Sequence, residues 1–167
     1  MVLTKPELIG LLQNEVRILL HLITKIEPHA VDYRPTEKQR SSIELLRYLG
    51  VMGPVLVKSA LNGTFEQADW VGRAEALKQA DLAAVTAAIE KHADEYGALL
   101  ANVPDEAFRK EIELFGRKST VGAFLVSTVL GGCAAYRTQL FNYLKACGRT
   151  ELGTMNLWAG IDPPPAA

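Results

Sequence analysis

Residues 120–148 decide the fold, and they read TVGAFLVSTVLGGCAAYRTQLFNYLKACG. Thr120 is a typical helix N-cap residue, and Gly148 is a typical C-terminal stop. Between them, mostly apolar side chains recur every three or four residues and therefore share one face of a helix. That face consists of Val121, Phe124, Leu125, Thr128, Val129, Gly132, Tyr136, Leu140, Tyr143 and Leu144. The stretch predicts one long helix that buries one side against other helices.

Three other stretches predict long helices of the same kind. They span residues 4–28, 41–62 and 81–104, and each ends at a proline or a glycine signal. The first starts with the spacing of a capping box, because Thr4 stands three residues before Glu7. Pro54 lies inside the second and removes a backbone donor, so we expect a kink near residues 50–53.

Shorter segments connect these helices. Residues 28–40 are polar and contain two prolines, which indicates an extended connection. Residues 62–80 are weakly amphipathic around Trp70 and predict a short helix against the bundle. Residues 111–118 alternate in polarity and predict a brief strand or an irregular loop.

The fold expected from this order is an all-α, up-down four-helix bundle with one long crossover connection between its first two helices. Residues 1–167 form a single domain, a usual length for one compact core. Residues 149–167 are expected to be a tail that packs on the bundle through its apolar residues, and Pro163–Pro165 to mark where order ends. These apolar residues are Leu152, Leu157, Trp158 and Ile161.

The charge balance excludes several partners. Eighteen Lys and Arg stand against 19 Asp and Glu, a net charge of −1, so no broad cationic face attracts nucleic acid or anionic lipid. No apolar run approaches the ~20 residues that cross a bilayer, because charges or amides interrupt every candidate. The start of the chain lacks a secretory signal pattern, so we expect a cytoplasmic protein. Cys133 and Cys147 lie about 21 Å apart on one helix and cannot form a disulfide with each other.

The sequence contains no pattern typical of a metal site or a phosphate-binding loop. The three histidines, His21, His29 and His92, lie on different elements without the three- or four-residue spacing of metal ligands. The Gly131-Gly132 pair lies inside a helix with no strand before it, unlike a phosphate loop. Two alternative explanations of this pair are open. Either another helix approaches closely here, or the glycines leave a cavity in the bundle.

Several polar residues are expected on inward faces. Tyr136 and Gln139 lie there on the last helix with Arg137 at the edge, and Tyr48 has the same character on the second helix. They either pack in the core with their hydroxyls reaching the surface or line a small-molecule pocket. His92 is either a hydrogen-bonded core histidine or a ligand-contacting, proton-transferring group.

Two segments make the chain resemble the DinB-like family of four-helix proteins, which includes metal-dependent and thiol-dependent transferases. They are Asp32-Tyr33-Arg34-Pro35-Thr36 leading to residues 42–49, and Tyr136-Arg137-Thr138-Gln139-Leu140 continuing to residues 143–145. The resemblance implies one histidine on the second helix and two on the fourth as metal ligands. Here these positions hold Tyr48, Gly132 and Tyr136, so neither the family's metal nor any other cofactor is expected.

Two function classes remain open. The first is a binding or interaction protein without metal, in which Tyr48, His92, Gly132, Tyr136, Arg137 and Gln139 are pocket candidates for a small molecule. The second is an enzyme that uses the same Tyr- and His-lined region for proton transfer. The resemblance also implies a homodimer, with Trp70, Phe141 and Trp158 as candidate contact residues.

Overall fold

The computed structural model describes residues 3–164 of the 167 in the chain. Pro165, the last residue of the proline run, lies outside the described part. The first helix, α1, spans Lys5–Ile23. Its predicted capping box is confirmed, since the Thr4 hydroxyl accepts from the backbone N–H of Glu7 and the Glu7 carboxylate accepts from the Thr4 N–H at 2.7 Å.

The second helix, α2, spans Ser42–Asn62 and also begins with a capping box, made by Ser41 and Glu44. Gly63 ends it in the left-handed region with φ +72°. The predicted connection before it contains the short 3-10 helix η1 (Pro28–Ala30) and an irregular crossover.

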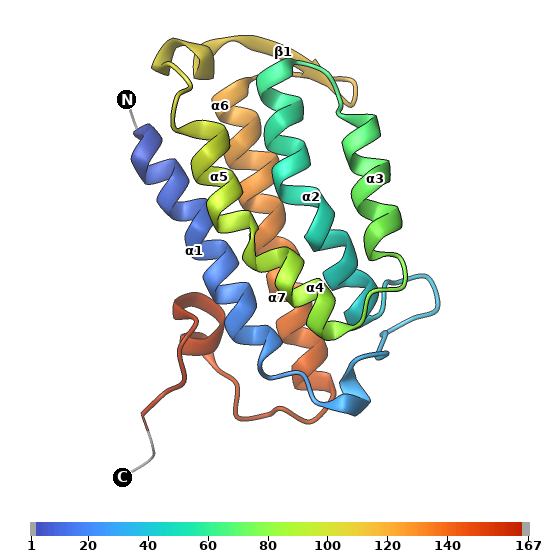
Figure 1. The fold of residues 1–167 in the computed structure, drawn as a ribbon. Coiled ribbons are helices and arrows are strands. Elements are labelled where there is room, and N and C mark those ends of the chain that lie inside the picture. The colour runs from blue at the N-terminus through green and yellow to red at the C-terminus, as the bar shows by residue number, and fades with distance from the viewer. Residues whose placement is uncertain (1–2, 165–167) are drawn as a thin grey trace.

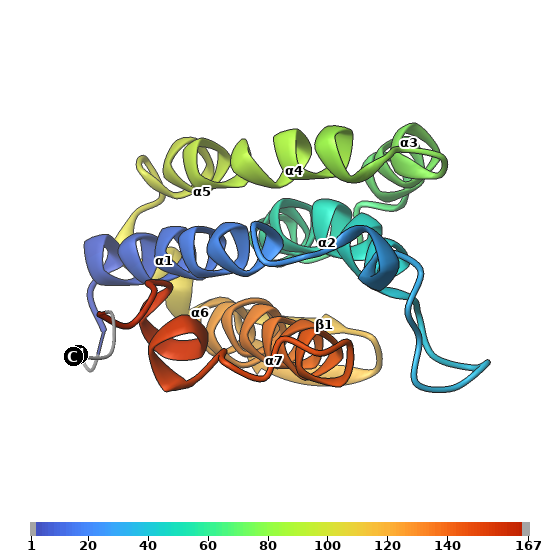
Figure 2. The ribbon, with the colours of Figure 1, turned by 90° about the horizontal axis from the view of Figure 1, so that it is seen from below.

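The chain then runs through α3 (Gln67–Leu77), α4 (Leu82–Glu90) and α5 (His92–Leu100). The short helix predicted around Trp70 is α3. The third long helix was expected to be continuous, but the structure divides it at Lys91. This residue keeps helical dihedral angles (φ −64°, ψ −22°), so α4 and α5 follow one another along one side of the bundle (Figure 2).

The segment predicted as a strand or loop is a β-hairpin. The 3-10 helix η2 (Asp105–Arg109) leads into β1 (Glu111–Leu114), which pairs with β2 (Arg117–Thr120) in antiparallel register. Ile112 and Leu114 on β1 are buried, so the hairpin closes one end of the bundle.

The last long helix contains a widened turn. It consists of α6 (Val121–Phe124), the π-helical turn η3 (Leu125–Leu130) and α7 (Gly131–Ala146). Thr120 caps it as predicted, because its hydroxyl accepts from the Ala123 N–H at 3.3 Å. In a π-turn the backbone N–H bonds to the carbonyl five residues earlier, which the Gly131 N–H does at Val126.

Four long helical rods form the bundle (Figures 1 and 2). The α4–α5 rod and the α6–α7 rod lie on opposite sides, and α1 and α2 each pack against both. The short α3 returns the chain alongside α2, so α4–α5 runs in the same direction as α2 (Figure 1). Because α3 also covers the outer side of α2, residues 49–57 are all buried, more than the amphipathic pattern predicts.

The helix from Val121 to Ala146 is long and apolar enough to cross a membrane by length and composition, although only 28% of its most apolar window is buried. We expect no such run from the sequence, but residues 121–136 carry no charge. In the structure this helix packs against α1 and α2, with Leu125 and Val129 fully buried between them.

The tail packs on the bundle differently from the prediction. The π-helical turn η4 (Met155–Ala159) contacts α1 and α7, and Leu152 is buried. Trp158 and Ile161, which we expected to pack, are 70% and 46% exposed. Polar contacts hold the tail instead, since Arg17 donates to two of its carbonyls.

Candidate functional site

Tyr48 of α2 and Tyr136 of α7 face one another across the bundle. Their ring centroids are 5.1 Å apart with an interplanar angle of 67°, an edge-to-face arrangement. The guanidinium of Arg40, from the crossover connection, lies over the Tyr48 ring at 4.1 Å from its centroid. Tyr48 therefore contacts both Tyr136 and Arg40.

The environment keeps the Tyr48 phenol protonated. Burial, followed by the hydrogen bond and charge of the neighbouring Tyr136 phenol, raises the pKa of Tyr48 to about 12. A phenol with this pKa is not a phenolate ligand or a general base at neutral pH.

Gly132 brings α7 close to α2 and does not leave a void. A Cβ at this position would lie 3.3 Å from the Met52 methyl carbon and 3.7 Å from its sulfur. Of the two explanations of the glycine pair, the structure supports close helix approach at Gly132, with Met52 filling the space.

His92 completes the backbone hydrogen bonding of α2. Pro54 has no N–H, so the carbonyl of Gly50 four residues earlier lacks its usual helical partner. The His92 Nε2 lies 3.0 Å from that carbonyl oxygen and donates to it. Burial lowers the pKa of His92 to about 4, which keeps the ring neutral at physiological pH. His92 is therefore the hydrogen-bonded core histidine, and its ring packs near that of Tyr96.

Behind the pair lies a second buried group of α5 and α7. Tyr96 is 1% exposed, and its hydroxyl occupies the space where Gly53 lacks a side chain, 1.9 Å from the position of a Cβ. Burial raises the pKa of the neighbouring Cys133 thiol to about 12. This cysteine is a packing residue and not an activated nucleophile.

The structure directs Arg137 and Gln139 away from Tyr136. Arg137 is 4% exposed and donates to both carboxylate oxygens of Glu15 on α1, at 2.7 and 3.1 Å. Gln139 donates to the Tyr143 hydroxyl, which in turn donates to the Arg40 carbonyl at 3.0 Å. Arg137 thus ties α7 to α1, and Gln139 helps to fix the connection that carries Arg40.

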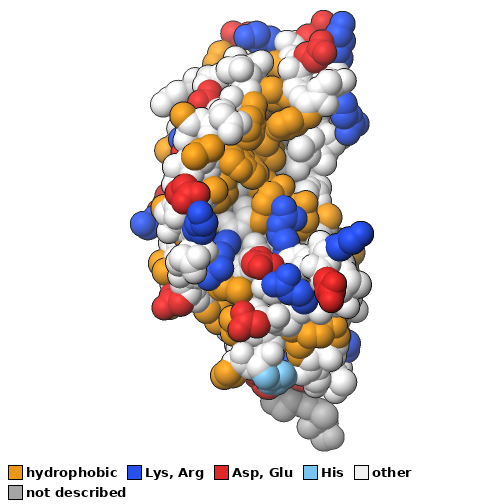
Figure 3. All heavy atoms as spheres, turned by 90° about the vertical axis from the view of Figure 1, so that its right-hand side faces the viewer, with side chains coloured by type: hydrophobic (Ala, Val, Ile, Leu, Met, Phe, Trp, Pro, Cys, Tyr) orange, Lys and Arg blue, Asp and Glu red, His pale blue; other side chains and the backbone are white. Residues whose placement is uncertain are grey.

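A row of aromatic side chains extends the tyrosine pair over the surface. The neighbours in this row, with ring centroids 5.1 to 6.4 Å apart, are Tyr136, Tyr48, Trp70, Phe65, Phe115 and Phe124. We call this row the aromatic strip. Figure 3 shows hydrophobic side chains gathered in a hollow on the face that carries α3, with charged side chains around them.

Phe115 marks the hairpin end of the aromatic strip. It is 61% exposed and has φ +55°, a left-handed conformation that costs a bulky residue free energy. The hairpin turn holds this conformation and places the ring against Phe65 and Phe124. Sequence reasoning did not find Arg40, Phe65 or Phe115 as site residues, because the paths of a crossover and of a turn leave no periodic signal.

These residues do not fit a divalent metal. In residues 3–164 no group of three His, Cys, Asp or Glu side chains lies together in a ligand-like cluster. The position where the family resemblance implies imidazoles holds two phenols and Met52.

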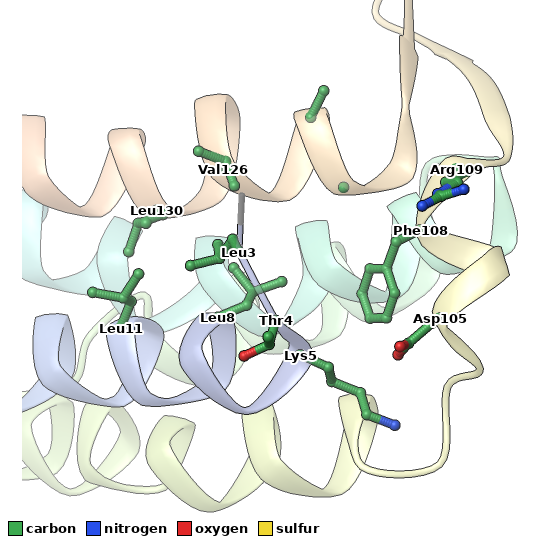
Figure 4. Close-up of a pocket in the computed structure, with 12 residues that line it drawn as sticks. Leu3, Thr4, Lys5, Leu8, Leu11, Asp105, Phe108, Arg109, Val126 and Leu130 are labelled. Atoms are coloured by element: carbon green, nitrogen blue, oxygen red, sulfur yellow. The ribbon is translucent and has the colours of Figure 1, made fainter. Parts of the chain in front are cut away.

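Two hollows lie elsewhere, between α1 and the α6–α7 rod. One of about 580 Å³ is lined by Leu8, Phe108 and Val126, among others, and Figure 4 shows these side chains pointing into it. A second of about 540 Å³ adjoins it. Neither is lined by Tyr48 or Tyr136.

Comparison with solved structures finds the same fold in YjoA, a DinB-like protein from Bacillus subtilis. The crystal structure of YjoA matches with a TM-score of 0.66 over 87% of this chain and 94% of that chain, at 20% sequence identity. No protein-family model matches the sequence, and no curated protein matches it. The chain therefore has a DinB-like helical-bundle fold, as the resemblance implied.

Proposed function

We propose that this DinB-like bundle is a small-molecule-binding protein whose metal site is degenerate. The observation that carries the proposal is the edge-to-face contact of Tyr48 and Tyr136 at 5.1 Å under the Arg40 guanidinium. Phenols and a cation at the position implied for metal ligands favour organic ligands over divalent cations.

The aromatic strip suggests the chemistry of the ligand. Half-buried rings such as Trp70 and Phe65 stack on planar apolar groups at little cost in side-chain entropy. Arg40 at one end favours an anionic substituent. The expected ligand is a planar aromatic molecule that carries a negative charge.

The alternative, an enzyme that uses the same region for proton transfer, is less well supported. General acids and bases work best with pKa values near the working pH. Here the pKa of Tyr48 is raised to about 12, that of Cys133 is raised to about 12, and that of His92 is lowered to about 4. Each of these shifts moves the pKa of its group further from pH 7. A pH-rate profile with an inflection that disappears on replacement of His92 would favour the enzyme.

Anilinonaphthalene sulfonate, a planar aromatic anion, tests the proposal. The chain contains two tryptophans, so a Trp158→Phe background leaves Trp70 as the reporter. Saturable energy transfer from Trp70 to the probe is expected, weakened about 10-fold by Phe65→Ala. Phe141→Ala, a half-buried phenylalanine outside the aromatic strip, is the matched control. Probe binding that responds equally to both substitutions would exclude the strip.

Elemental analysis of the purified protein tests the degenerate metal site separately. We expect no stoichiometric transition metal, because the ligand set offers no imidazole or carboxylate cluster in the described residues. Bound Ni²⁺ or Zn²⁺ near one per chain would overturn this part of the proposal. The proposal also places the protein in the cytoplasm, where Cys133 and Cys147, both free, stay reduced.

A further inference from the structure

A hollow separate from the tyrosine pair opens where α1 and the last rod diverge. Helix α1 packs against α7 and the η3 turn but contacts α6 less closely, and a space of about 580 Å³ remains near the N-terminal turns of both rods. Figure 4 shows Leu8, Leu11 and Val126 pointing into this space, with Phe108 of η2 at one end. Its volume lies within the range of about 300–1,000 Å³ that is typical of small-molecule sites.

This hollow continues into the second one, of about 540 Å³. Leu11, Val126 and Leu130 line both, so the two form one trough, which we call the α1–α6 groove. On α1 its lining extends from Thr4 to Ile18, which corresponds to about 21 Å along the helix axis. An acyl chain spans one leaflet of the hydrocarbon core of a bilayer, about 15 Å. The groove is therefore long enough for a single extended acyl chain.

The lining of the first hollow favours a flexible hydrocarbon chain. Apart from Phe108, its apolar side chains are aliphatic, namely Leu3, Leu8, Leu11, Ala123, Val126 and Leu130. Leu11 and Val126 lie on facing helices and are 41% and 43% exposed, so folding leaves this aliphatic surface in water. A hydrocarbon chain between them would remove apolar area of both partners from water.

Positive charge gathers at one end of the groove. Arg109 and Lys5 line the first hollow against one carboxylate, Asp105, and in the described part of the chain none of these three side chains forms an ion pair. The Lys5 ammonium donates to two backbone carbonyls at 2.8 and 2.9 Å, and these neutral acceptors do not cancel its charge. At the other end, Arg137 is paired with Glu15 at 2.7 Å. The charge distribution therefore favours an anionic head group at the Arg109 end.

We propose that the α1–α6 groove binds a fatty acid. The hydrocarbon chain lies along α1 between the two rods, and the carboxylate accepts hydrogen bonds from the Arg109 guanidinium, whose two parallel N–H donors match a carboxylate. This site is separate from the aromatic strip, because neither hollow is lined by Tyr48, Trp70 or Phe65. It therefore goes beyond the planar aromatic ligand proposed for the strip.

Isothermal titration calorimetry with octanoate, decanoate and dodecanoate, each below its micelle concentration, tests the proposal. We expect one site per chain and an affinity that rises by up to about 4-fold for each added CH₂ group. Val126→Phe fills the groove and should weaken decanoate binding by about 10-fold. Val71→Phe is the matched control, because Val71 is 46% exposed on α3 and lines neither hollow, so the affinity should persist.

A comparison of decanoate with the uncharged decanol tests the head group. Arg109→Gln should weaken decanoate binding by about 10-fold and leave decanol binding unchanged. Arg117→Gln is the control, because Arg117 is an exposed arginine of β2 outside both hollows, and it should change neither. Phe65→Ala should leave decanoate binding unchanged, which distinguishes failure of this proposal from failure of the aromatic strip.

Three results would overturn the proposal. They are the absence of saturable decanoate binding, equal effects of the two phenylalanine substitutions, and equal effects of Arg109→Gln on decanoate and decanol. Association of the protein with phosphatidylcholine vesicles, without binding of free decanoate, would assign the groove to a membrane surface and would also refute the fatty acid.

Discussion

Replacement of His92 by glutamine should reduce the loss of unfolding free energy that the fold shows on acidification. The imidazole is 3% exposed, and burial lowers its pKa from 6.5 to about 4. Between these pH values the unfolded chain carries a proton on His92 that the folded chain does not. The free energy of unfolding therefore rises with pH through this window. This contribution is complete above pH 6.5 and lost below about pH 4.

The magnitude follows from the two pKa values. A change from 6.5 to about 4 corresponds to about 3 kcal/mol of unfolding free energy, of which about 2 kcal/mol is lost between pH 7 and pH 5. Glutamine keeps an N–H donor for the Gly50 carbonyl but does not titrate. His92→Gln should cost about 1–2 kcal/mol at pH 7 through imperfect geometry and then lose much less than the wild type on acidification.

Urea denaturation followed by circular dichroism at several pH values from 7 to 5 measures this difference. His29→Gln is the control for the loss of a histidine, because the His29 side chain is 60% exposed. The pKa of His21 is also lowered, chiefly by burial, but this residue is present in all three proteins and cancels. Parallel pH profiles for wild type and His92→Gln would refute the reasoning.

Three further substitutions test the packing around the site, each by urea denaturation. Gly53→Ala should destabilise the fold by about 3 kcal/mol, because its Cβ would collide with the Tyr96 hydroxyl. Adding Tyr96→Phe should recover part of this loss, and additive effects of the two substitutions would contradict the account. Gly132→Ala should change stability by less than about 1 kcal/mol, since a flexible methionine is its neighbour, and a larger loss would contradict the account. Arg137→Met should lower the free energy of unfolding by about 3–5 kcal/mol, because it leaves Glu15 unpaired. Adding Glu15→Leu should restore most of the stability, and no recovery would argue against the ion pair.

The helix starts could be predicted because their signals are local. Thr4, Ser41, Asp81 and Thr120 cap their helices with side chains that reach only three residues along the chain. The break at Lys91 could not be predicted in the same way, since helical dihedral angles persist through it and tertiary packing decides it.

Part of the site was also predictable. The facing positions of Tyr48 and Tyr136 follow from the family resemblance and are found in the structure. The sequence pattern also predicts Arg137 near this pair, but adjacent residues on a helix point about 100° apart, and this geometry separates Arg137 from Tyr136. Arg40 reaches Tyr48 from an irregular crossover, whose path depends on contacts that no spacing encodes.

The widened turn η3 has a consequence for aligning this chain with other bundles. One extra residue in a helical turn rotates everything that follows by on the order of 100° about the axis. In a relative with a regular turn here, equivalent side chains should align only with a one-residue gap inside residues 125–130.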